Sequence, residues 1–182
     1  MLANDQMFQA ALEDLHLTLI EAKQVFDERL KIPNRAGVYV IGIWAAPPVI
    51  TETDYPHPCI QIGQTEYAIA YVGETWAIKN RLLDHLVGDC RASNFRHSIL
   101  ALRAAGSISI GPVSEAALSE HLLAEAIVGF CEPEFIGPAE RSLIDALQPA
   151  FNIRGCRDAG WKKLLQAARK NFSAAKARQD VA

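Results

Sequence analysis

The spacing of hydrophobic and polar positions changes several times along the chain, and each change marks an expected element. Continuous apolar runs rich in β-branched and aromatic residues predict buried strands near 37–44, 67–73 and 126–131. Apolar residues at three- and four-residue steps predict helices near 76–87, 95–105, 114–125 and 138–147. We therefore expect an α/β (α+β) fold in which a small, mainly antiparallel three-stranded sheet is packed by helices.

Further helices are expected at both ends of this core. Residues 7–30 carry an apolar stripe at helical spacing, and Pro33 stops the pattern. Residues 161–178 form a basic amphipathic pattern with Trp161 and Leu165 on its apolar side. The expected organisation is an N-terminal helical extension, a central domain and a basic C-terminal helix or tail, over 1–36, 37–152 and 153–182.

The composition indicates a single reduced, intracellular domain. Half of the 182 residues are hydrophobic, which is enough for one sizeable core. The four cysteines are far apart and form no CxxC pair, as is typical of packed thiols in a cytosolic protein. No basic segment followed by an apolar core opens the chain, and no apolar run is long enough to span a bilayer. We expect a cytoplasmic protein without a membrane segment.

Charge is distributed unevenly around a net value of −3. The three regions carry −2, −7 and +6 in chain order. The acidic centre counts against tight DNA binding by that surface, whereas the basic end can supply phosphate contacts through Lys162, Lys163, Arg169 and Lys170. Within the centre, a basic stretch containing Arg91, Arg96 and Arg103 is either a solvated helix face or a DNA-contact edge.

A compact polar group stands where the strand near 67–73 meets the following helix. Tyr71 lies at the end of the strand, and Arg81 and His85 are four residues apart, so they share one helix face. An arginine fork suits a phosphate, and a histidine can move protons near neutral pH. Taken alone, such a pair is more often an ordinary solvated helix face, because Arg and His are common on amphipathic helices.

The rest of the chain gives this group a context. An earlier strand opens with Gly37-Val38-Tyr39, the second carries Tyr71-Val72-Gly73, and Arg81, His85, Glu140 and Asn152 follow in order. This set resembles the GIY-YIG nuclease family, and the Arg-x-x-x-His and Glu-to-Asn spacings are most similar to its restriction-endonuclease branch. Two features depart from the family pattern: the connection between the tyrosines is long, and Glu74 stands where the family often has a lysine.

The resemblance implies roles for the aromatic and basic residues. Tyr39 would help activate the attacking water as general base, assisted by His85, while Tyr71 orients the water or the phosphate. Arg81 would bind the scissile phosphate. A tyrosine with a pKa of about 10 is a poor base at neutral pH, so its surroundings must lower that pKa. The alternative is that both tyrosines are core aromatics with satisfied hydroxyls.

The resemblance also implies a metal site. Pro138 suits the first position of a helix, which would put Glu140 in the first turn as sole protein ligand of Mg²⁺ or Mn²⁺. Asn152 would hydrogen-bond within the site and fix its geometry. The alternatives are a helix-terminus glutamate that serves stability and a turn asparagine after Pro149.

These features predict a divalent-metal-dependent DNA endonuclease, a phosphodiester hydrolase, with restriction-type cleavage as the first expectation. The alternatives are a structure-specific repair or mobile-element nicking nuclease and a non-catalytic nucleic-acid-binding protein that keeps the fold. DNA is the expected partner, and a homodimer is compatible with so short a chain.

Overall fold

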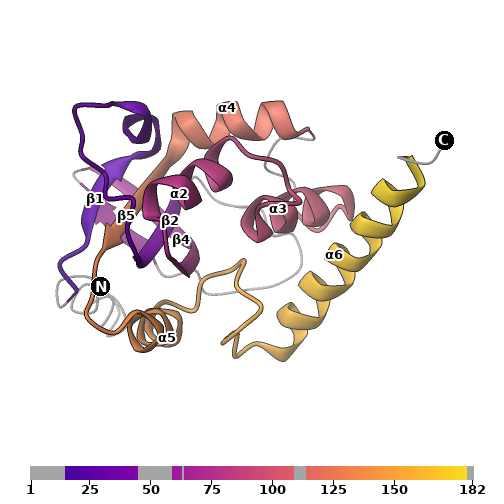
Figure 1. Cartoon of the computed structure of the whole chain (residues 1–182). Coiled ribbons are helices and arrows are strands. Elements are labelled where there is room, and N and C mark those ends of the chain that lie inside the picture. Colours follow the sequence, from indigo (N-terminus) through magenta and orange to yellow (C-terminus); the bar gives the residue numbers. More distant parts are fainter. Residues whose placement is uncertain (1–14, 45–58, 63, 109–113, 180–182) are drawn as a thin grey trace.

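The computed structural model describes residues 15–44, 59–62, 64–108 and 114–179. Its centre is a five-stranded sheet, antiparallel throughout, in the order β1-β5-β2-β4-β3 (Figure 1). The bounds of the strands are β1 Thr18–Glu21, β2 Gly37–Trp44, β3 Cys59–Ile62, β4 Thr65–Thr75 and β5 Ala126–Cys131. The three predicted strands are the three central ones, and the prediction of only three strands is wrong because β1 and β3 extend the sheet on both sides.

Five α-helices lie in the described ranges, each where the apolar spacing predicts one. Their bounds are α2 Ile78–Leu86, α3 Asn94–Ala104, α4 Glu115–Glu125, α5 Ile136–Leu147 and α6 Ala159–Gln179. The hydroxyls of Ser93 and Ser114 cap α3 and α4 by accepting a backbone N–H. Gly106 follows α3 at a φ of +69°, a backbone conformation that favours glycine at a helix end.

The N-terminal segment differs from its prediction. Within the described part of the predicted helix over 7–30, Thr18–Glu21 is strand β1 and Ala22–Phe26 is a 3-10 helix, η1; residues 7–14 lie outside the described residues. Strand β1 pairs with β5 along its full length, from Thr18↔Phe130 to Glu21↔Ile127. Long-range pairing with a sheet edge supplies the backbone hydrogen bonds that a helix would otherwise supply, and apolar spacing alone does not reveal such a partner.

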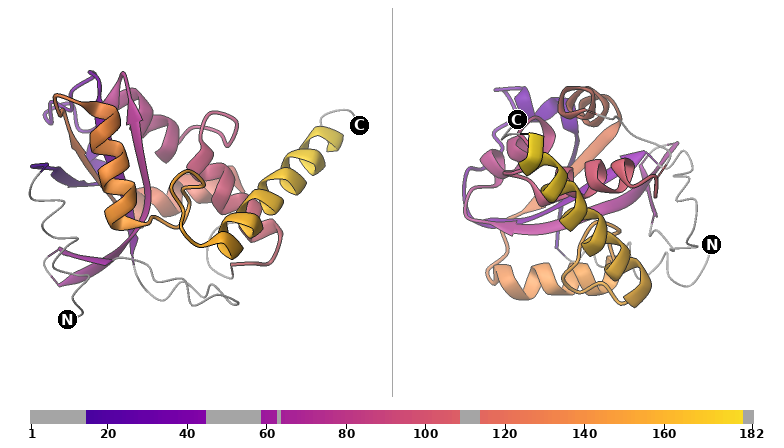
Figure 2. Two further views of the ribbon diagram at one scale, coloured as in Figure 1. Left: turned by 90° about the horizontal axis from the view of Figure 1, so that it is seen from below. Right: turned by 90° about the vertical axis from the view of Figure 1, so that its right-hand side faces the viewer.

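The two faces of the sheet carry separate cores. On the first face, Tyr39 and Ile41 pack with side chains from η1, α2, α3, α4 and α6. On the second face, Val38 and Val40 pack with Leu143 and its neighbours on α5. Figure 2 shows α5 on one side of the sheet and α2, α3 and α4 on the other. Because side chains alternate along a strand, consecutive residues of β2 serve opposite cores.

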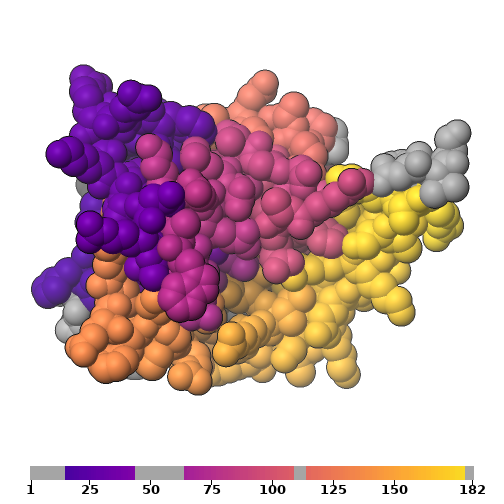
Figure 3. Space-filling view, in the orientation of Figure 1, coloured from indigo at the N-terminus to yellow at the C-terminus, as the bar shows by residue number. Residues whose placement is uncertain are grey.

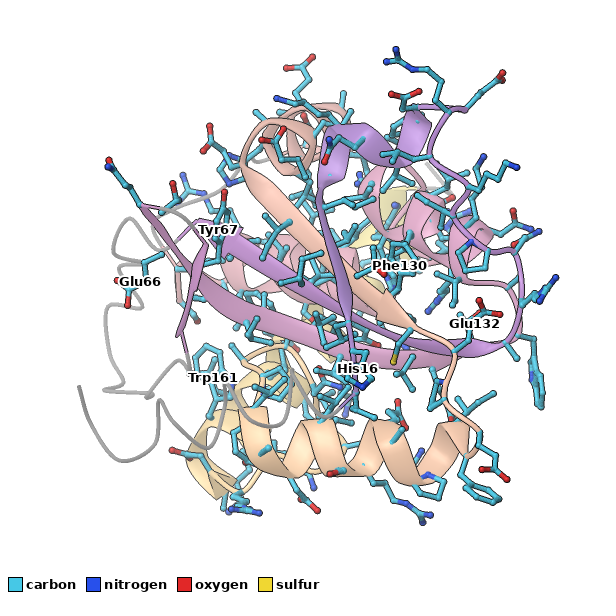
Figure 4. All side chains as sticks on the ribbon, turned by 90° about the vertical axis from the view of Figure 1, so that its left-hand side faces the viewer. His16, Glu66, Tyr67, Phe130, Glu132 and Trp161 are labelled. Carbon is cyan, nitrogen blue, oxygen red and sulfur yellow. The ribbon has the colours of Figure 1, made fainter. Side chains whose placement is uncertain are left out.

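The ends of the strands define two ends of the sheet. The first residue of β2 is paired with the last of β4, Gly37↔Thr75, and the next residue of β2 is paired with the last of β5, Val38↔Cys131. Glu132 therefore marks this end of the sheet in Figure 4, whereas Glu66 and Tyr67 mark the opposite end. The helices α2 and α5 both begin near the Gly37 end, one on each face.

The C-terminal helix α6 is packed against the first face rather than attached as a free tail. Trp161 is buried, and its indole Nε1 donates a hydrogen bond of 2.6 Å to the carbonyl of Ala150. Leu165 and Ala168 are buried on the same side of the helix. None of the helices in the described ranges is long and apolar enough to cross a membrane.

Candidate active site

A β-bulge decides which way Tyr71 points. Ile41 of β2 pairs with Tyr71, but the next residue, Gly42, pairs with Ile69, so Ala70 is an extra residue in β4. As a result Ala70 and Tyr71 both pack on the first face, whereas Ile69 and Val72 pack on the second. If Ala70 were paired in regular register, strict alternation from Ile69 would send Tyr71 to the face that α5 covers.

Gly73 leaves room for the ring of Tyr39. The two residues are paired across β2 and β4, and a Cβ atom placed on Gly73 would overlap the hydroxyl oxygen of Tyr39. The absence of a side chain at this position lets the tyrosine ring lie across the neighbouring strand. Gly73 at the end of Tyr71-Val72-Gly73 therefore makes room for Tyr39 at the end of Gly37-Val38-Tyr39.

Helix α2 brings Arg81 and His85 to the same hydroxyl. Tyr39 Oη and His85 Nε2 are 2.7 Å apart, and the His85 ring also lies against Tyr71 at a centroid distance of 5.2 Å. Arg81 interacts with the hydroxyl of Tyr39, and its Nη1 donates to the carbonyl of Ala92 at 2.7 Å. Arg81 and His85, which helical spacing places on one face, therefore both interact with the hydroxyl of Tyr39.

Burial sets the protonation states of this group. Burial raises the pKa of Tyr39. The side chains of Tyr71 and Glu140 raise this pKa further, whereas the Arg81 guanidinium lowers it. Burial, with the cations of Arg81 and Arg96, holds the pKa of His85 well below its ordinary value. The side chains at rest are therefore a protonated tyrosine and a neutral imidazole at neutral pH.

Ser93 completes the surroundings of His85 and is a residue that the sequence did not connect with the site. Its Oγ is 2.7 Å from His85 Nδ1 and also accepts the backbone N–H of Arg96 at 3.1 Å. The sequence identifies Ser93 only as a helix cap. No spacing rule links residues eight apart across a turn, so this contact follows from how α2 and α3 meet.

Glu140 reaches the site from the second face, on α5. The helix begins at Ile136, so Pro138 is its third residue and Glu140 its fifth; the prediction that Glu140 lies in the first turn is wrong. The residue is 8% exposed, and its Oε2 has no hydrogen-bond partner among the described residues. The Nη1 of Arg154 is 3.7 Å away. Burial and the nearby charge of Glu74 raise the pKa of Glu140.

Asn152 holds the edge of β4. Its side-chain amide accepts the backbone N–H of Val72 at 2.9 Å and donates to the carbonyl of Val72 at 2.8 Å. The backbone N–H of Phe151 donates to the carbonyl of Ala70 at 3.0 Å. The segment therefore pairs with the bulged part of β4, on either side of Tyr71, and contacts the site through that strand.

Comparison with known protein families decides what this arrangement belongs to. The model of the GIY-YIG catalytic domain matches residues 37–171, most of the chain. The chain belongs to the GIY-YIG family. A GIY-YIG catalytic domain implies a nuclease, a phosphodiester hydrolase whose substrate is a nucleic acid. Curated proteins and solved structures give no match.

Two of the arginines predicted to contact nucleic acid in this GIY-YIG domain have structural roles instead. The guanidinium of Arg96 has no exposed surface and pairs with Glu115 at 2.9 Å while donating to the carbonyl of Leu86 at 2.9 Å. Arg103 Nη1 donates to the carbonyl of Ile108 at 3.3 Å, and its Nε is buried without a partner among the described residues. The Arg96 prediction is wrong because a buried ion pair joins α3 to α4 there. Arg91, by contrast, is exposed.

The basic residues of α6 separate in the same way. Arg169 donates to the hydroxyl of Ser98 and to the carbonyls of Asn94 and Phe151, so its guanidinium joins α6 to α3. Lys163 and Lys170 are exposed, and Lys162 is partly exposed. In the space-filling view α6 forms an outer ridge of the molecule (Figure 3). Among the predicted nucleic-acid contacts, Lys163 and Lys170 of this ridge are exposed, as Arg91 is.

Proposed function

We propose that this GIY-YIG nuclease is a divalent-metal-dependent DNA endonuclease with restriction-type cleavage. The observation that carries the proposal is the meeting of His85 and Arg81 at the hydroxyl of Tyr39. Glu140 lies at the same end of the sheet, with an Oε2 that has no hydrogen-bond donor among the described residues. A proton acceptor, a phosphate-binding cation and a buried acid are the three groups that phosphodiester hydrolysis requires.

The proposed roles follow from the environment of each group. Tyr39 takes the proton of the attacking water, which requires that its raised pKa fall when substrate is bound. Arg81 supports this directly, because a cation beside a phenol favours the phenolate. The same guanidinium is placed to bind the scissile phosphate, while Tyr71, stacked beside Tyr39 at a centroid distance of 6.3 Å, orients water or phosphate.

The donor set fits a hard divalent cation at Glu140. One carboxylate oxygen has no hydrogen-bond donor among the described residues, and burial, with repulsion from Glu74, raises the pKa of Glu140. A divalent ion would satisfy that oxygen and offset the repulsion, and Mg²⁺ or Mn²⁺ accepts a site with few protein ligands because it keeps most of its waters. Bound there, such an ion would neutralise charge that develops on the phosphate and on the leaving oxygen.

The choice of DNA and of restriction-type cleavage has weaker support. The exposed lysines of α6 give a charge ridge that suits a phosphate backbone. The spacing from Arg81 to His85 and from Glu140 to Asn152 supports the restriction branch over the other GIY-YIG branches. The acidic central region opposes tight DNA binding by that surface, which leaves the phosphate contacts to the basic C-terminal region.

Incubation with supercoiled plasmid separates these functions. The full-length protein is mixed with plasmid and Mg²⁺, with and without a chelator, and an RNA of equal charge is run in parallel. Discrete linear fragments that the chelator abolishes are the expected result. Nicked circles would indicate a nicking nuclease instead of a restriction-type one. Preferential loss of the RNA would show that RNA, not DNA, is the substrate. Plasmid that is bound but unchanged would support the non-catalytic alternative.

A further inference from the structure

A line of hydrogen bonds runs from the backbone of α3 to the hydroxyl of Tyr39. Arg96 N is 3.1 Å from Ser93 Oγ, Ser93 Oγ is 2.7 Å from His85 Nδ1, and His85 Nε2 is 2.7 Å from Tyr39 Oη. Ser93 and His85 have no exposed surface and Tyr39 is 1% exposed. Buried polar groups need partners, so a hydrogen that has no acceptor within this line costs least where solvent can reach it.

The direction of the line follows from its fixed end. A backbone N–H can only donate, so Ser93 Oγ is an acceptor toward Arg96. A neutral imidazole has one donor and one acceptor. If Nδ1 of His85 carried the hydrogen, Ser93 would accept twice, and its own O–H would have no acceptor within the described part of the chain.

The opposite tautomer satisfies Ser93 and leaves over the hydroxyl hydrogen of Tyr39 instead. With the hydrogen on Nε2, the hydroxyl of Ser93 donates to Nδ1, and His85 donates to the oxygen of Tyr39. Each bond then points from α3 toward the site. Tyr39 keeps 1% of its surface exposed whereas Ser93 has none, so the hydrogen left over is the one that solvent can accept, and it must leave to solvent before Tyr39 can take a proton from water.

We propose that Ser93 is a positioning residue that holds His85 in the Nε2–H tautomer, so that His85 donates a hydrogen bond to Tyr39 rather than accepting its proton. The catalytic consequence rests on the proposed nuclease function, whereas the tautomer does not. A donor aimed at a phenol oxygen stabilises the phenolate, which is the form of Tyr39 that can take a proton from water. His85 thereby offsets part of the burial that disfavours this form.

The tautomer is read directly by NMR of the full-length, ¹⁵N-labelled protein. Long-range ¹H–¹⁵N correlations distinguish a protonated from an unprotonated ring nitrogen, and His85→Gln assigns the signals. Wild type at neutral pH is expected to show a protonated Nε2 and an unprotonated Nδ1. Ser93→Ala removes the donor and is expected to average the two shifts by tautomer exchange, while Ser93→Thr keeps the hydroxyl and restores the pattern.

Ser114→Ala is the matched control. Ser114 caps α4 by accepting the N–H of Ala117 at 3.2 Å, as Ser93 caps α3, so its loss removes a cap of the same kind at an exposed site. This variant is expected to leave the His85 signals unchanged. In cleavage assays Ser93→Ala is expected to shift the midpoint of the pH–rate profile upward by about one unit, a loss of about tenfold at neutral pH, with no shift for Ser114→Ala.

Three results would overturn the proposal. A protonated Nδ1 or an imidazolium in the wild type would do so without any variant, and hence even if Ser93→Ala failed to fold. Unchanged His85 signals in a folded Ser93→Ala would remove the role of Ser93, and an unshifted pH–rate midpoint would remove its catalytic consequence. A wild type with the expected tautomer but no cleavage would instead count against the nuclease proposal alone.

Discussion

The two faces of the sheet contribute unlike halves to the candidate site. From the first face, Tyr39 and His85 arrive as neutral, buried groups, and His85 is 2.7 Å from both the hydroxyl of Tyr39 and the hydroxyl of Ser93. From the second face, Glu140 arrives with an oxygen that has no donor among the described residues, close to the like charge of Glu74. A satisfied network is typical of groups that the protein itself holds in place, whereas an unsatisfied acid indicates a group that waits for a ligand.

Removing the charge of Glu140 tests whether this acid binds a metal ion, and it has the largest expected effect. Glu140→Gln keeps the size of the side chain but removes the charge that a hard cation needs. Cleavage of plasmid is expected to fall to background even at raised Mg²⁺, while DNA affinity is kept or increases because a negative charge is lost near the phosphate. Plasmid cleavage and DNA affinity are measured on the same preparations.

The control for Glu140 lies on the same helix. Asp145→Asn removes one charge from an exposed position of α5 that pairs with Arg157 at 3.6 Å. This variant is expected to cleave as wild type does. Metal-dependent cleavage by Glu140→Gln would show that the acid is not the metal anchor, and Glu74 and Asp84 would be tested next.

Removing the hydroxyl of Tyr39 tests the proton-handling half. Tyr39→Phe keeps the ring against Gly73, and cleavage is expected to fall at least about a hundredfold, as for the loss of a general base. The free energy of unfolding is expected to fall by about 1–3 kcal/mol, because the ring N–H or N of His85 is left buried without its partner at 2.7 Å. Single-turnover cleavage and urea unfolding provide the two measurements.

Tyr67→Phe is the matched variant for this experiment. Tyr67 is partly buried, lies on β4 and packs with the second face, away from His85. Both measurements are expected to stay near their wild-type values. If Tyr39→Phe cleaved DNA at a rate near that of wild type, the hydroxyl of Tyr39 would not take part in the reaction. The residues of the first face would then have a structural role only.

The basic helix on the first face extends the comparison from chemistry to binding. If Lys163 and Lys170 contact phosphates, the double variant Lys163→Gln/Lys170→Gln is expected to flatten the slope of log affinity against log salt by about two. Both side chains are exposed, so the fold is unaffected. Truncation before Trp161 would not serve, because that residue is buried and α6 holds α3 through Arg169.

The control for Lys163→Gln/Lys170→Gln is a variant that loses two positive charges elsewhere in the chain. Lys23→Gln/Lys31→Gln removes two exposed cations from the N-terminal segment. Its salt slope is expected to equal that of wild type. Equal slopes for both double variants and wild type would place the phosphate contacts elsewhere, with exposed Arg91 tested first.

The smallest expected effect is a pH dependence of stability that belongs to His85. Its folded pKa lies well below the unfolded value of about 6.5, so the unfolded chain binds the proton more readily. The contribution to stability is complete above pH 6.5 and is lost as the pH falls from there toward the folded pKa, at about 1.4 kcal/mol per unit. His85→Gln is expected to have the flatter profile in this window.

A residual slope is expected in the variant from His97, whose pKa is also lowered by burial. The comparison is therefore the difference between two urea-unfolding series, wild type and His85→Gln, from pH 7.5 downward. Parallel series would mean that His85 is already charged in the folded protein. The site residues on the first face would then include a charged imidazole, contrary to what the burial of His85 indicates.

Much of the architecture follows from local spacing in the sequence. The period of apolar residues is sufficient to predict β2, β4, β5 and the five α-helices, because alternation and helical repeat are properties of a single segment. The same spacing predicts that Arg81 and His85 share one face of α2, four residues apart. The caps at Ser93 and Ser114 are also local, because each hydroxyl accepts a backbone N–H three residues further along its own helix.

The tertiary structure decided the features that depend on distant partners. Strand β1 exists because β5 offers an edge, and Arg96 and Arg169 are structural because the carboxylate and carbonyls they bind come from other elements. A one-residue shift of register between β2 and β4 turns Tyr71 toward Tyr39. The sequence by itself determined which residue types stand near the site, but pairing, register and burial determined which of them meet, because these depend on atoms far apart in the chain.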